Sequence, residues 1–466
     1  RKDSLFVAIP GFKTDGRKYI ADAIEKGASV IVTEGTIEAP ENNITVISVP
    51  DARNALALLS AQFYGYPSRR LRMIGITGTN GKTTTSYLIK SIIEGAGKRC
   101  GLFGTISYII GDETMPAPHT TPESSDLQKY LYKIIETGAE YAVMEVSSHA
   151  LELNRVADCE FDIAVFTNLT QDHLDFHKTM EDYFNAKLKL FTSLSNERGK
   201  MVKKVGIINI DDPYSKRILD AMKVKAVTYG FNKDADIRPD DIRMDINGIS
   251  FKAVTPKGIF PVESKLTGKY NIKNILSAIG VGQGLGFDNS IIADGIRAVE
   301  SVSGRFEKID EGQDFAVVVD YAHTEDALKR LLEAAKEFAK GRIITVFGCG
   351  GDRDKGKRPK MGEAAGKLSD IVIITSDNPR SEDPIEIIKA IEEGIKGIKN
   401  GRPRDYLIMP DRREAIYKAI GLAKKDDIVV IAGKGHEDYQ IIGDKKIHFD
   451  DREMAREAIK TVVSRK

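Results

Sequence analysis

The stretch Thr77-Gly78-Thr79-Asn80-Gly81-Lys82-Thr83-Thr84-Thr85 places a lysine and a run of hydroxyls behind a glycine, between a short apolar run at 71–76 and a helical apolar stripe at 86–94. Backbone N–H groups of such a loop and of the following helix can hold phosphate oxygens, because they carry partial positive charge and point at the ligand. Lys82 would neutralise the terminal phosphates, and the Thr83 hydroxyl would ligate Mg2+. The stretch therefore predicts a nucleotide-phosphate site between a strand and a helix.

The match to the general phosphate-loop pattern G-x-x-x-x-G-K-[ST] is incomplete. That pattern requires glycine at position 76, where this chain has Ile76, with glycines at 75 and 78 instead. On this segment alone, a glycine-rich turn that binds nothing is the alternative.

Length, charge and cysteine content narrow the class of protein. At about 150 residues per domain, 466 residues suggest three domains. The 69 Lys and Arg residues balance 68 Asp and Glu residues, so no overall basic field indicates nucleic acid or an anionic membrane surface. Cys100, Cys159 and Cys349 are too few and too far apart for a disulfide framework or a cysteine metal site. No apolar run reaches the roughly 18 residues of a membrane span, and no signal peptide is evident. We expect a soluble cytoplasmic protein that binds no nucleic acid.

The order of apolar runs and helical stretches predicts an α/β protein of three units: 1–70, 71–303 and 304–466. The first is a small α/β unit. The second has a mostly parallel sheet and, at 236–261, an antiparallel ribbon. The third is a Rossmann-like α/β unit with a parallel sheet. The expected strands lie at 5–9, 29–32, 45–49, 72–77, 141–146, 163–166, 205–210, 226–229, 316–320, 343–347, 371–375, 406–409 and 428–432.

Acidic and imidazole side chains follow two of the central strands. Glu145 ends the strand at 141–146, where a phosphate-loop domain places a Mg2+ ligand, and Ser147, Ser148 and His149 come next. Loop 167–177 holds His173 and His177, which have helical spacing, with Asp172 and Asp175, and these carboxylates favour oxygen-type Mg2+ chemistry over zinc. A solvated strand-end carboxylate is the alternative for Glu145.

A third polar stretch, His119-Thr120-Thr121-Pro122-Glu123, has the pattern of a helix start. Thr121 is expected as N-cap and Pro122 as the first helical residue. A substrate contact is compatible with that role, because a helix N-terminus attracts carboxylates and phosphates.

Three loops of the last unit follow parallel strands and therefore emerge at one edge of its sheet. They are the cation-rich glycine loop 347–359, Asp377-Asn378-Pro379-Arg380 and Gly433-Lys434-Gly435-His436-Glu437. Arginine forks bind carboxylates and Glu437 can pair an ammonium, so the set suits a zwitterionic amino acid. Solvated turns with scattered charge are the alternative for any single loop.

These segments, in this order, resemble the Mur ligase family, and most closely its MurE type. The resemblance covers nearly the whole chain, and the family's own phosphate loop, G-T-N-G-K-T, accounts for Ile76. The matching segments are 5–11, 75–85, 119–123, 145–151, 167–177, 183–191, 304–307, 320–324, 347–359, 377–380 and 433–440.

The resemblance implies ATP-dependent amide bond formation on UDP-MurNAc-L-Ala-D-Glu, through an acyl phosphate and a tetrahedral intermediate, with meso-diaminopimelate as the added amino acid. The first unit would then bind the UDP substrate, the second ATP and the third the amino acid. The catalytic residues implied are Lys82, Glu145, His173 and Lys187. The resemblance further implies that Lys187 is carried as a carbamate, N6-carboxylysine, and that Thr83, Glu145, His173 and this carbamate hold or flank Mg2+.

The same resemblance carries over the binding residues. ATP is expected at Gly78, Thr79, Asn80, Gly81, Lys82, Thr83, Thr84, Asn271, Asn274, Arg305, Asp320 and His323. The UDP-muramoyl dipeptide is expected at Thr120, Thr121, Ser147, Ser148 and Arg155. Diaminopimelate is expected at Arg353, Asp377, Asn378, Arg380, Gly433 and Glu437. The choice of diaminopimelate over lysine depends on Asn378 and on Arg380, which can clamp the second carboxylate that lysine lacks.

Two departures from the family pattern qualify these expectations. Only residues 1–4 precede the first strand, where the family has a longer segment near the uridine, so we expect that the natural start is missing and the uracil pocket incomplete. Glu325 stands where the family commonly has proline, with little consequence expected at a helix start. The alternatives are an L-lysine-adding form, a folylpolyglutamate synthetase, which would lack the 377–380 loop, and a nucleotide-binding regulator without catalysis. We expect a monomer.

Overall fold

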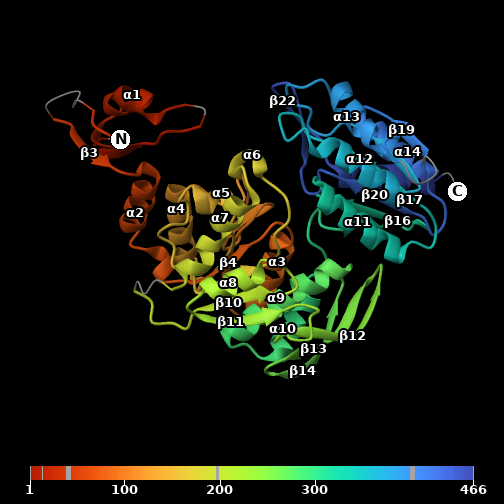
Figure 1. The fold of residues 1–466 in the computed structure, drawn as a ribbon, viewed down its shortest axis with the longest axis horizontal. Coiled ribbons are helices and arrows are strands. Elements are labelled where there is room, and N and C mark those ends of the chain that lie inside the picture. The colour runs from red at the N-terminus through yellow and green to blue at the C-terminus, as the bar shows by residue number, and fades with distance from the viewer. Residues whose placement is uncertain (1, 13, 38–42, 196–198, 399–404, 465–466) are drawn as a thin grey trace.

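The computed structural model describes residues 2–12, 14–37, 43–195, 199–398 and 405–464. The chain forms three successive α/β units, seen in Figure 1 as a small red sheet, an orange-to-green body and a blue body. Among the described residues, no helix has the length and apolar character needed to cross a membrane.

The first unit is a three-stranded parallel sheet in the order β1-β2-β3. Its small core contains Ala8, Ile20, Ala28 and Ile31. Helix α2 leads from this sheet to the central body (Figure 1). The elements are β1 (Ser4–Ala8), η1 (Gly16–Tyr19), α1 (Ile20–Glu25), β2 (Ala28–Glu34), β3 (Thr45–Val49), α2 (Ala52–Phe63) and η2 (Pro67–Arg69).

The central unit is built on an eight-stranded sheet in the order β11-β10-β9-β4-β8-β5-β6-β7. The six strands from β11 to β5 run parallel, and β6 and β7 add an antiparallel edge. The strands are β4 (Arg72–Thr77), β5 (Cys100–Phe103), β6 (Ser107–Ile110), β7 (Glu113–Pro116), β8 (Tyr141–Glu145), β9 (Ile163–Phe166), β10 (Val205–Asn209) and β11 (Lys225–Tyr229).

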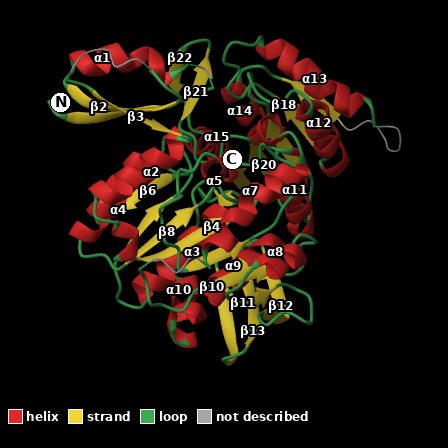
Figure 2. Ribbon diagram, turned by 60° about the vertical axis from the view of Figure 1, so that its left-hand side comes forward, coloured by secondary structure: helices red, strands yellow, loops and turns green. Residues whose placement is uncertain are grey.

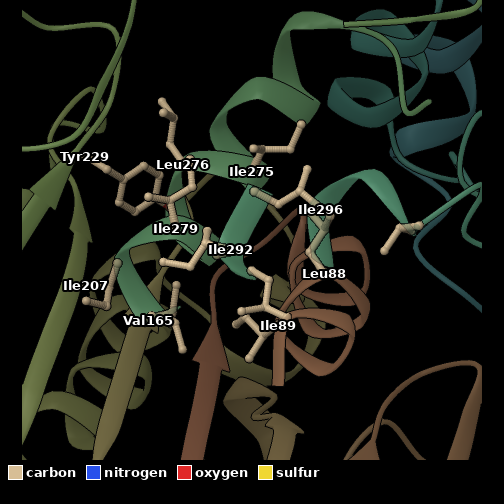
Figure 3. Packing of buried hydrophobic residues seen from close by; sticks show 14 of the residues in the cluster. Leu88, Ile89, Val165, Ile207, Tyr229, Ile275, Leu276, Ile279, Ile292 and Ile296 are labelled. Carbon is tan, nitrogen blue, oxygen red and sulfur yellow. The ribbon is translucent and has the colours of Figure 1, made fainter. Parts of the chain in front are cut away.

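Helices cover both faces of this sheet (Figure 2). Strands such as β4, β8 and β9 are therefore buried on both sides, which accounts for their nearly continuous apolar sequences. Figure 3 shows one face, where Leu88 of α3, Ile279 of α9 and Ile292 of α10 pack against Val165 and Ile207 of the sheet. The helices of this unit are α3 (Lys82–Gly95), α4 (Ser124–Glu136), α5 (Ser148–Glu152), α6 (Leu174–His177), α7 (Met180–Ser193), α8 (Ser215–Ala221), α9 (Lys269–Leu285) and α10 (Asn289–Arg297).

A three-stranded antiparallel ribbon follows β11, as the sequence predicts. It consists of β12 (Arg238–Asp245), β13 (Gly248–Thr255) and β14 (Gly258–Ser264). Alternate residues of β13, including Phe251 and Ala253, are buried and join the core beneath α9.

The last unit has a six-stranded sheet in the order β15-β16-β20-β17-β18-β19, parallel except at β15. Its strands are β15 (Glu307–Lys308), β16 (Ala316–Asp320), β17 (Ile343–Phe347), β18 (Ile371–Ile374), β19 (Asp405–Ile408) and β20 (Ile428–Ala432), with a hairpin of β21 (Tyr439–Ile442) and β22 (Lys445–His448). Its helices are α11 (Glu325–Phe338), α12 (Lys357–Leu368), α13 (Pro384–Lys396), α14 (Arg412–Leu422) and α15 (Asp451–Val463).

The predicted α/β class with mostly parallel sheets is confirmed, whereas the predicted helix start at Thr121 is wrong. Helix α4 begins at Ser124 with Glu123 as N-cap. The Thr121 hydroxyl instead donates to the Glu145 carbonyl at 2.8 Å and accepts from the Ser147 amide at 3.1 Å, so it joins the end of β8. The unit boundaries at 70/71 and 303/304 stay predictions.

Candidate functional site

The phosphate loop connects β4 to α3, and its backbone requires glycine at two positions. Gly78 has φ +149°, and a Cβ there would lie 1.9 Å from Thr167 Oγ1. Gly81, with φ +87°, is the N-cap of α3, and its Cβ would lie 2.4 Å from Asn274 Oδ1. Ile76 differs from the general pattern because it is still inside β4 and fully buried in the core.

Two lysines from different helices converge on one carbonyl of this loop. Lys82 Nζ donates to Gly78 O at 3.0 Å and to Thr79 O at 2.8 Å, and Lys187 Nζ of α7 donates to Gly78 O at 2.8 Å. Burial lowers the pKa of both ammonium groups, that of Lys187 well below its ordinary value, and the charge of Lys82 lowers the pKa of Lys187 further. Lys187 is therefore a buried amine beside the phosphate loop that loses its proton easily.

Glu145 lies fully buried at the carboxyl end of β8 and faces the first turn of α3. Its Oε2 accepts from Thr83 Oγ1 at 3.0 Å and from Thr105 Oγ1 at 3.0 Å, and its Oε1 accepts from the Thr105 amide at 2.9 Å. Thr105 follows β5, the neighbour of β8 in the sheet, and was missed in the sequence, although its strand-end position was a usable signal.

The donor set fits Mg2+ at the Thr83 and Glu145 pair. A buried carboxylate and a hydroxyl in contact are hard oxygen ligands, and Mg2+ is commonly held by one or two carboxylates plus substrate phosphates. No group of three or more His, Cys, Asp or Glu side chains suited to a metal occurs within the described ranges, so waters, phosphates or a modified Lys187 would supply the remaining ligands.

His173 sits at the entrance to α6 rather than on a helical face with His177. It is the N-cap of α6 with φ 54°, and its Nε2 lies 3.4 Å from Asp172 Oδ2. Its ring packs edge-on against that of His149, with centroids 4.8 Å apart. Partial desolvation lowers the pKa of His173, although 43% of its side chain is exposed, so a neutral imidazole is available there.

The residues expected to hold the UDP-linked substrate lie together beside Glu145. Arg155 Nη1 donates to Thr121 O at 3.2 Å, and Thr121 Oγ1 contacts Ser147 Oγ at 3.4 Å. Thr120 Oγ1 lies 3.2 Å from Thr105 Oγ1, and Ser148 Oγ lies 2.9 Å from His177 Nε2. His177, which had no predicted role, thus positions Ser148.

Among the expected nucleotide residues of the last unit, Arg305 contacts the phosphate loop segment directly. Arg305 Nη2 donates to Thr83 Oγ1 at 3.1 Å, and its guanidinium lies 4.8 Å from the centroid of the Tyr321 ring. Asp320 accepts from the Phe306 amide at 2.6 Å, which fixes the segment that carries Arg305, and burial raises the pKa of Asp320.

Asn271 and Asn274 of α9 are linked by a side-chain hydrogen bond of 2.9 Å, and Asn274 packs against Gly81. Asn271 and Arg305 line a cavity of about 450 Å³ between the ribbon and the segment at 300–310. Of the predicted nucleotide residues, these two share a cavity, and Arg305 connects it to the phosphate loop through its hydrogen bond to Thr83.

A larger cavity of about 770 Å³ lies between the central and last units. Its walls are loops that follow parallel strands of both sheets, namely β8, β9, β16, β17, β18 and β20. It brings together His173 and His323 with all six residues predicted for the amino acid: Arg353, Asp377, Asn378, Arg380, Gly433 and Glu437. Asp326, which was missed in the sequence, also lines it and accepts from Asn80 Nδ2 of the phosphate loop at 3.0 Å.

The arginine at the far end of this cavity is held in an unusual conformation. Arg380 has φ 53°, and its backbone is fixed by hydrogen bonds to Ile441 at 3.1 Å and Gly443 at 2.8 Å. Its Nη1 donates to Gly351 O at 2.7 Å, which ties the glycine loop to the 377–380 loop. The remaining guanidinium N–H groups can bind a carboxylate.

Known proteins share both the sequence and the fold of this chain. Three family models match: "Mur ligase family, catalytic domain" over 1–64, "Mur ligase middle domain" over 76–282 and "Mur ligase, glutamate ligase domain" over 304–435. The UDP-N-acetylmuramoyl-L-alanyl-D-glutamate--2,6-diaminopimelate ligase of Caldanaerobacter subterraneus subsp. tengcongensis is 49% identical over 98% of this chain and 92% of that protein. The chain belongs to the Mur ligase family.

Other Mur ligases are similar to this chain in sequence or in fold. The ligase of the same name from Geobacillus thermodenitrificans is 47% identical, over 98% of this chain and 92% of its own length. A solved structure of a UDP-N-acetylmuramoyl-L-alanyl-D-glutamate--2,6-diaminopimelate ligase superposes with a TM-score of 0.69 at 36% identity, covering 99% of this chain and 93% of that one. The MurF ligase of Thermotoga maritima, solved with ADP, shares the fold at 19% identity and a TM-score of 0.66, over 100% and 96% of the two chains. The resemblance to the MurE type of Mur ligase is confirmed.

Proposed function

We propose that this protein is an ATP-dependent amide ligase that adds meso-diaminopimelate to UDP-MurNAc-L-Ala-D-Glu, a step in peptidoglycan precursor synthesis. The observation that carries the proposal is the larger cavity, which joins His173 and Asp326, beside the phosphate loop, to the six side chains suited to a zwitterionic amino acid. The relatives named for this reaction support the same conclusion.

The reaction has two steps, and this chain serves them by positioning and charge. A carboxylate oxygen of the dipeptide substrate attacks the γ-phosphorus of ATP, the bond to the β-phosphate oxygen breaks, and ADP leaves. The substrate ammonium loses one proton to solvent, and the resulting amine attacks the acyl carbon. The tetrahedral intermediate then loses phosphate with the carbon–oxygen bond electrons, and the nitrogen gives up a second proton to become the amide. Lys82 would balance the γ-phosphate charge, and so would Arg305, whose guanidinium lies 3.1 Å from the Thr83 hydroxyl.

We propose Mg2+ at Thr83 and Glu145, flanked by His173 and a carbamate on Lys187. When bound, the ion would neutralise charge on the phosphate oxygens. Two observations support the carbamate. Lys187 is buried beside Lys82, and its pKa is strongly lowered. The neutral amine, which is the form that reacts with carbon dioxide, is therefore present without a high pH. The carbamate would be an anion that the positive charge of Lys82 attracts. The same charge repels the unmodified ammonium of Lys187.

The part of the cavity lined by the amino-acid residues would bind both the far carboxylate and an ammonium group of diaminopimelate. Arg380 would clamp the far carboxylate, since its guanidinium is fixed in direction by the Gly351 carbonyl. Glu437 and Asp377, both lining the cavity, would receive an ammonium group. L-lysine lacks the far carboxylate and would leave Arg380 without a partner.

Phosphate release from ATP tests the proposal. The full chain would be given Mg2+, UDP-MurNAc-L-Ala-D-Glu and either meso-diaminopimelate, L-lysine or no amino acid. We expect release with diaminopimelate and little with the other two. Equal release with lysine would favour the lysine-adding form, and no release with any amine would favour a regulator that binds nucleotide without catalysis. The cytoplasmic location and the monomeric state stay predictions.

A further inference from the structure

A fully buried lysine lies directly behind the carboxylate proposed to receive the substrate ammonium. Lys434 is 0% exposed, and its Nζ lies 3.3 Å from Glu437 Oε2 and 3.4 Å from Asn378 Oδ1. The sequence predicts individual roles for Asn378 and Glu437 and none for Lys434. Its burial is unusual, because a charged lysine is almost never fully buried unless it is paired.

The three side chains form a closed triangle that fixes the direction of the carboxylate. Asn378 Nδ2 donates to Glu437 Oε2 at 2.9 Å, so Oε2 accepts from both the amide and the ammonium. Within the described part of the chain, Glu437 Oε1 has no hydrogen-bond partner. Glu437 and Asn378 line the larger cavity, whereas Lys434 does not, so the lysine lies behind the carboxylate and a ligand would approach from the front.

Lys434 is the cation paired directly with Glu437. Arg412 is engaged by Asp451, with both side chains fully buried and 2.7 Å apart. Lys434 is the cation that contacts Glu437 directly, and the carboxylate of Asp377 lies near enough to raise the pKa of Glu437. The Oε1 of Glu437 is the acceptor that an ammonium group of the substrate would meet.

Burial raises the pKa of Glu437 above its ordinary value, Lys434 lowers it, and the negative charge of Asp377 raises it. Without Lys434, the cavity would favour the protonated acid, which cannot pair an ammonium. The titratable and charged groups that face Glu437 are Lys434, Asp377, Tyr321, Tyr439 and Arg412.

We propose that Lys434 is a positioning residue that keeps Glu437 ionised and aimed into the cavity, and thereby sets the acid limit for binding of the amino-acid substrate. This inference rests on the proposed function for the identity of that substrate. The class of ligand is an amine whose ammonium meets Glu437 Oε1.

The test compares Lys434→Met and Lys434→Gln, which remove the charge, with Lys434→Arg, which keeps it. The KM for meso-diaminopimelate is measured by phosphate release between about pH 6 and 9, together with the KM for ATP. We expect the neutral variants to raise the KM for diaminopimelate about tenfold or more at neutral pH, with the KM for ATP unchanged. The acid limb of the plot of 1/KM against pH should move to higher pH by about one to three units. An opposite charge within about 4–6 Å lowers the pKa of a carboxyl group by that amount, and these variants remove the charge. Lys434→Arg should retain most of the wild-type profile.

A second readout does not depend on turnover. The Glu437 carboxylate is followed by its infrared band as a function of pH in the full chain, and the band is assigned as the one lost in Glu437→Gln. The neutral variants should show a higher pKa for Glu437 than the wild type, and Lys434→Arg should not. If the wild type releases no phosphate with diaminopimelate, the proposed function fails while this titration still decides the role of Lys434. An unchanged Glu437 titration in folded Lys434→Met or Lys434→Gln would overturn the inference, as would a loss of kcat alone with unshifted pH profiles.

Discussion

At the scale of single residues, the site depends on buried groups whose charge is set by their neighbours. Lys187 has an inconspicuous sequence context, and only the resemblance to the Mur ligase family gave it a role. The structure places its amine 2.8 Å from Gly78 O, beneath the phosphate loop. Two positive charges, Lys82 and Lys187, share that carbonyl in a buried setting, which favours conversion of one of them to an anion.

Substitution of Lys187 should therefore remove an anion that short acids can replace. We expect Lys187→Ala to lower kcat by about 100-fold or more, comparable to loss of one preorganised electrostatic group. Formate, acetate or propionate should restore part of the activity, because a small carboxylate fits the vacated space. The control is Lys189→Ala, two residues further along α7, where the lysine is exposed and pairs with Glu152. Failure of all three acids to raise the activity of Lys187→Ala would argue against the carbamate.

The partly buried His436 should make the fold sensitive to acid. Burial lowers the pKa of His436 to about 3, and the charge of Arg305 lowers it as well. The unfolded chain takes up this proton near pH 6.5, whereas the folded chain resists it, so stability present above about pH 6.5 is lost as the pH falls. His436→Gln should reduce that loss by on the order of 1 kcal/mol per pH unit between about pH 6 and 4.

The control for this prediction is His448, an exposed residue on β22. The Glu453 carboxylate raises the pKa of His448, so its contribution to stability is complete below about pH 6.5 and is lost as the pH rises through the folded pKa. His448→Gln should leave the slope between about pH 6 and 4 unchanged. Urea unfolding at several pH values measures both variants, and identical slopes for His436→Gln and wild type would contradict the account.

At the scale of elements, the sequence predicted the buried strands well and their outer neighbours poorly. Continuous apolar runs such as 343–347 identify strands covered on both faces, and each was found where expected. The strands β5, β6 and β7 at one end of the central sheet were missed, because they are four residues each, and β6 and β7 are also partly polar. Thr121 has the composition of an N-cap, yet its hydroxyl bonds the end of β8, a tertiary contact that no local pattern reveals.

Some parts of the candidate site could be predicted from the sequence, and others could not. Strand-end loops such as 377–380 were predictable, because parallel strands bring their carboxyl ends to one edge. Asp326 and Lys434 were not, since their roles depend on which loop lies opposite in space. A charged residue in the first turn of α11 looks like ordinary support for the helix dipole until its contacts are seen.

Asp326 connects α11 of the last unit to the phosphate loop of the central unit. Its Oδ2 accepts from Asn80 Nδ2 at 3.0 Å and from Thr170 Oγ1 at 3.1 Å, and Arg330 holds the same carboxylate. We expect Asp326→Ala to raise the KM for ATP about tenfold, since a hydrogen bond to a charged group contributes about 1.5–3 kcal/mol and its loss leaves the loop and the helix to be ordered by the nucleotide.

The matched control is Glu325→Ala, which removes the same charge from the preceding residue of α11. Its KM for ATP should stay near that of the wild type. Steady-state kinetics with ATP varied at saturating amino acid measures both. Equal effects of the two variants would mean that the charge of the helix start matters and the contact to Asn80 does not.

At the scale of the whole molecule, two parallel sheets present their carboxyl edges to one cavity. The central sheet contributes the loops after β8 and β9, and the last sheet those after β16, β17, β18 and β20. Arg380 and Asp326 both line this cavity, and Asp326 connects it to Asn80 of the phosphate loop. This arrangement suits an enzyme that activates a carboxylate at one end and selects an amine at the other.

We propose that this cavity selects an amino acid by its second carboxylate. The most direct test is the ratio of kcat/KM for meso-diaminopimelate to kcat/KM for L-lysine, in the wild type and in Arg380→Ala. We predict a wild-type ratio of roughly 100 or more, because a charge-assisted bidentate contact contributes about 2–3 kcal/mol, and a ratio that falls at least tenfold in Arg380→Ala. A wild-type ratio near one, or an Arg380→Ala variant that loses activity equally with both amino acids, would contradict the account.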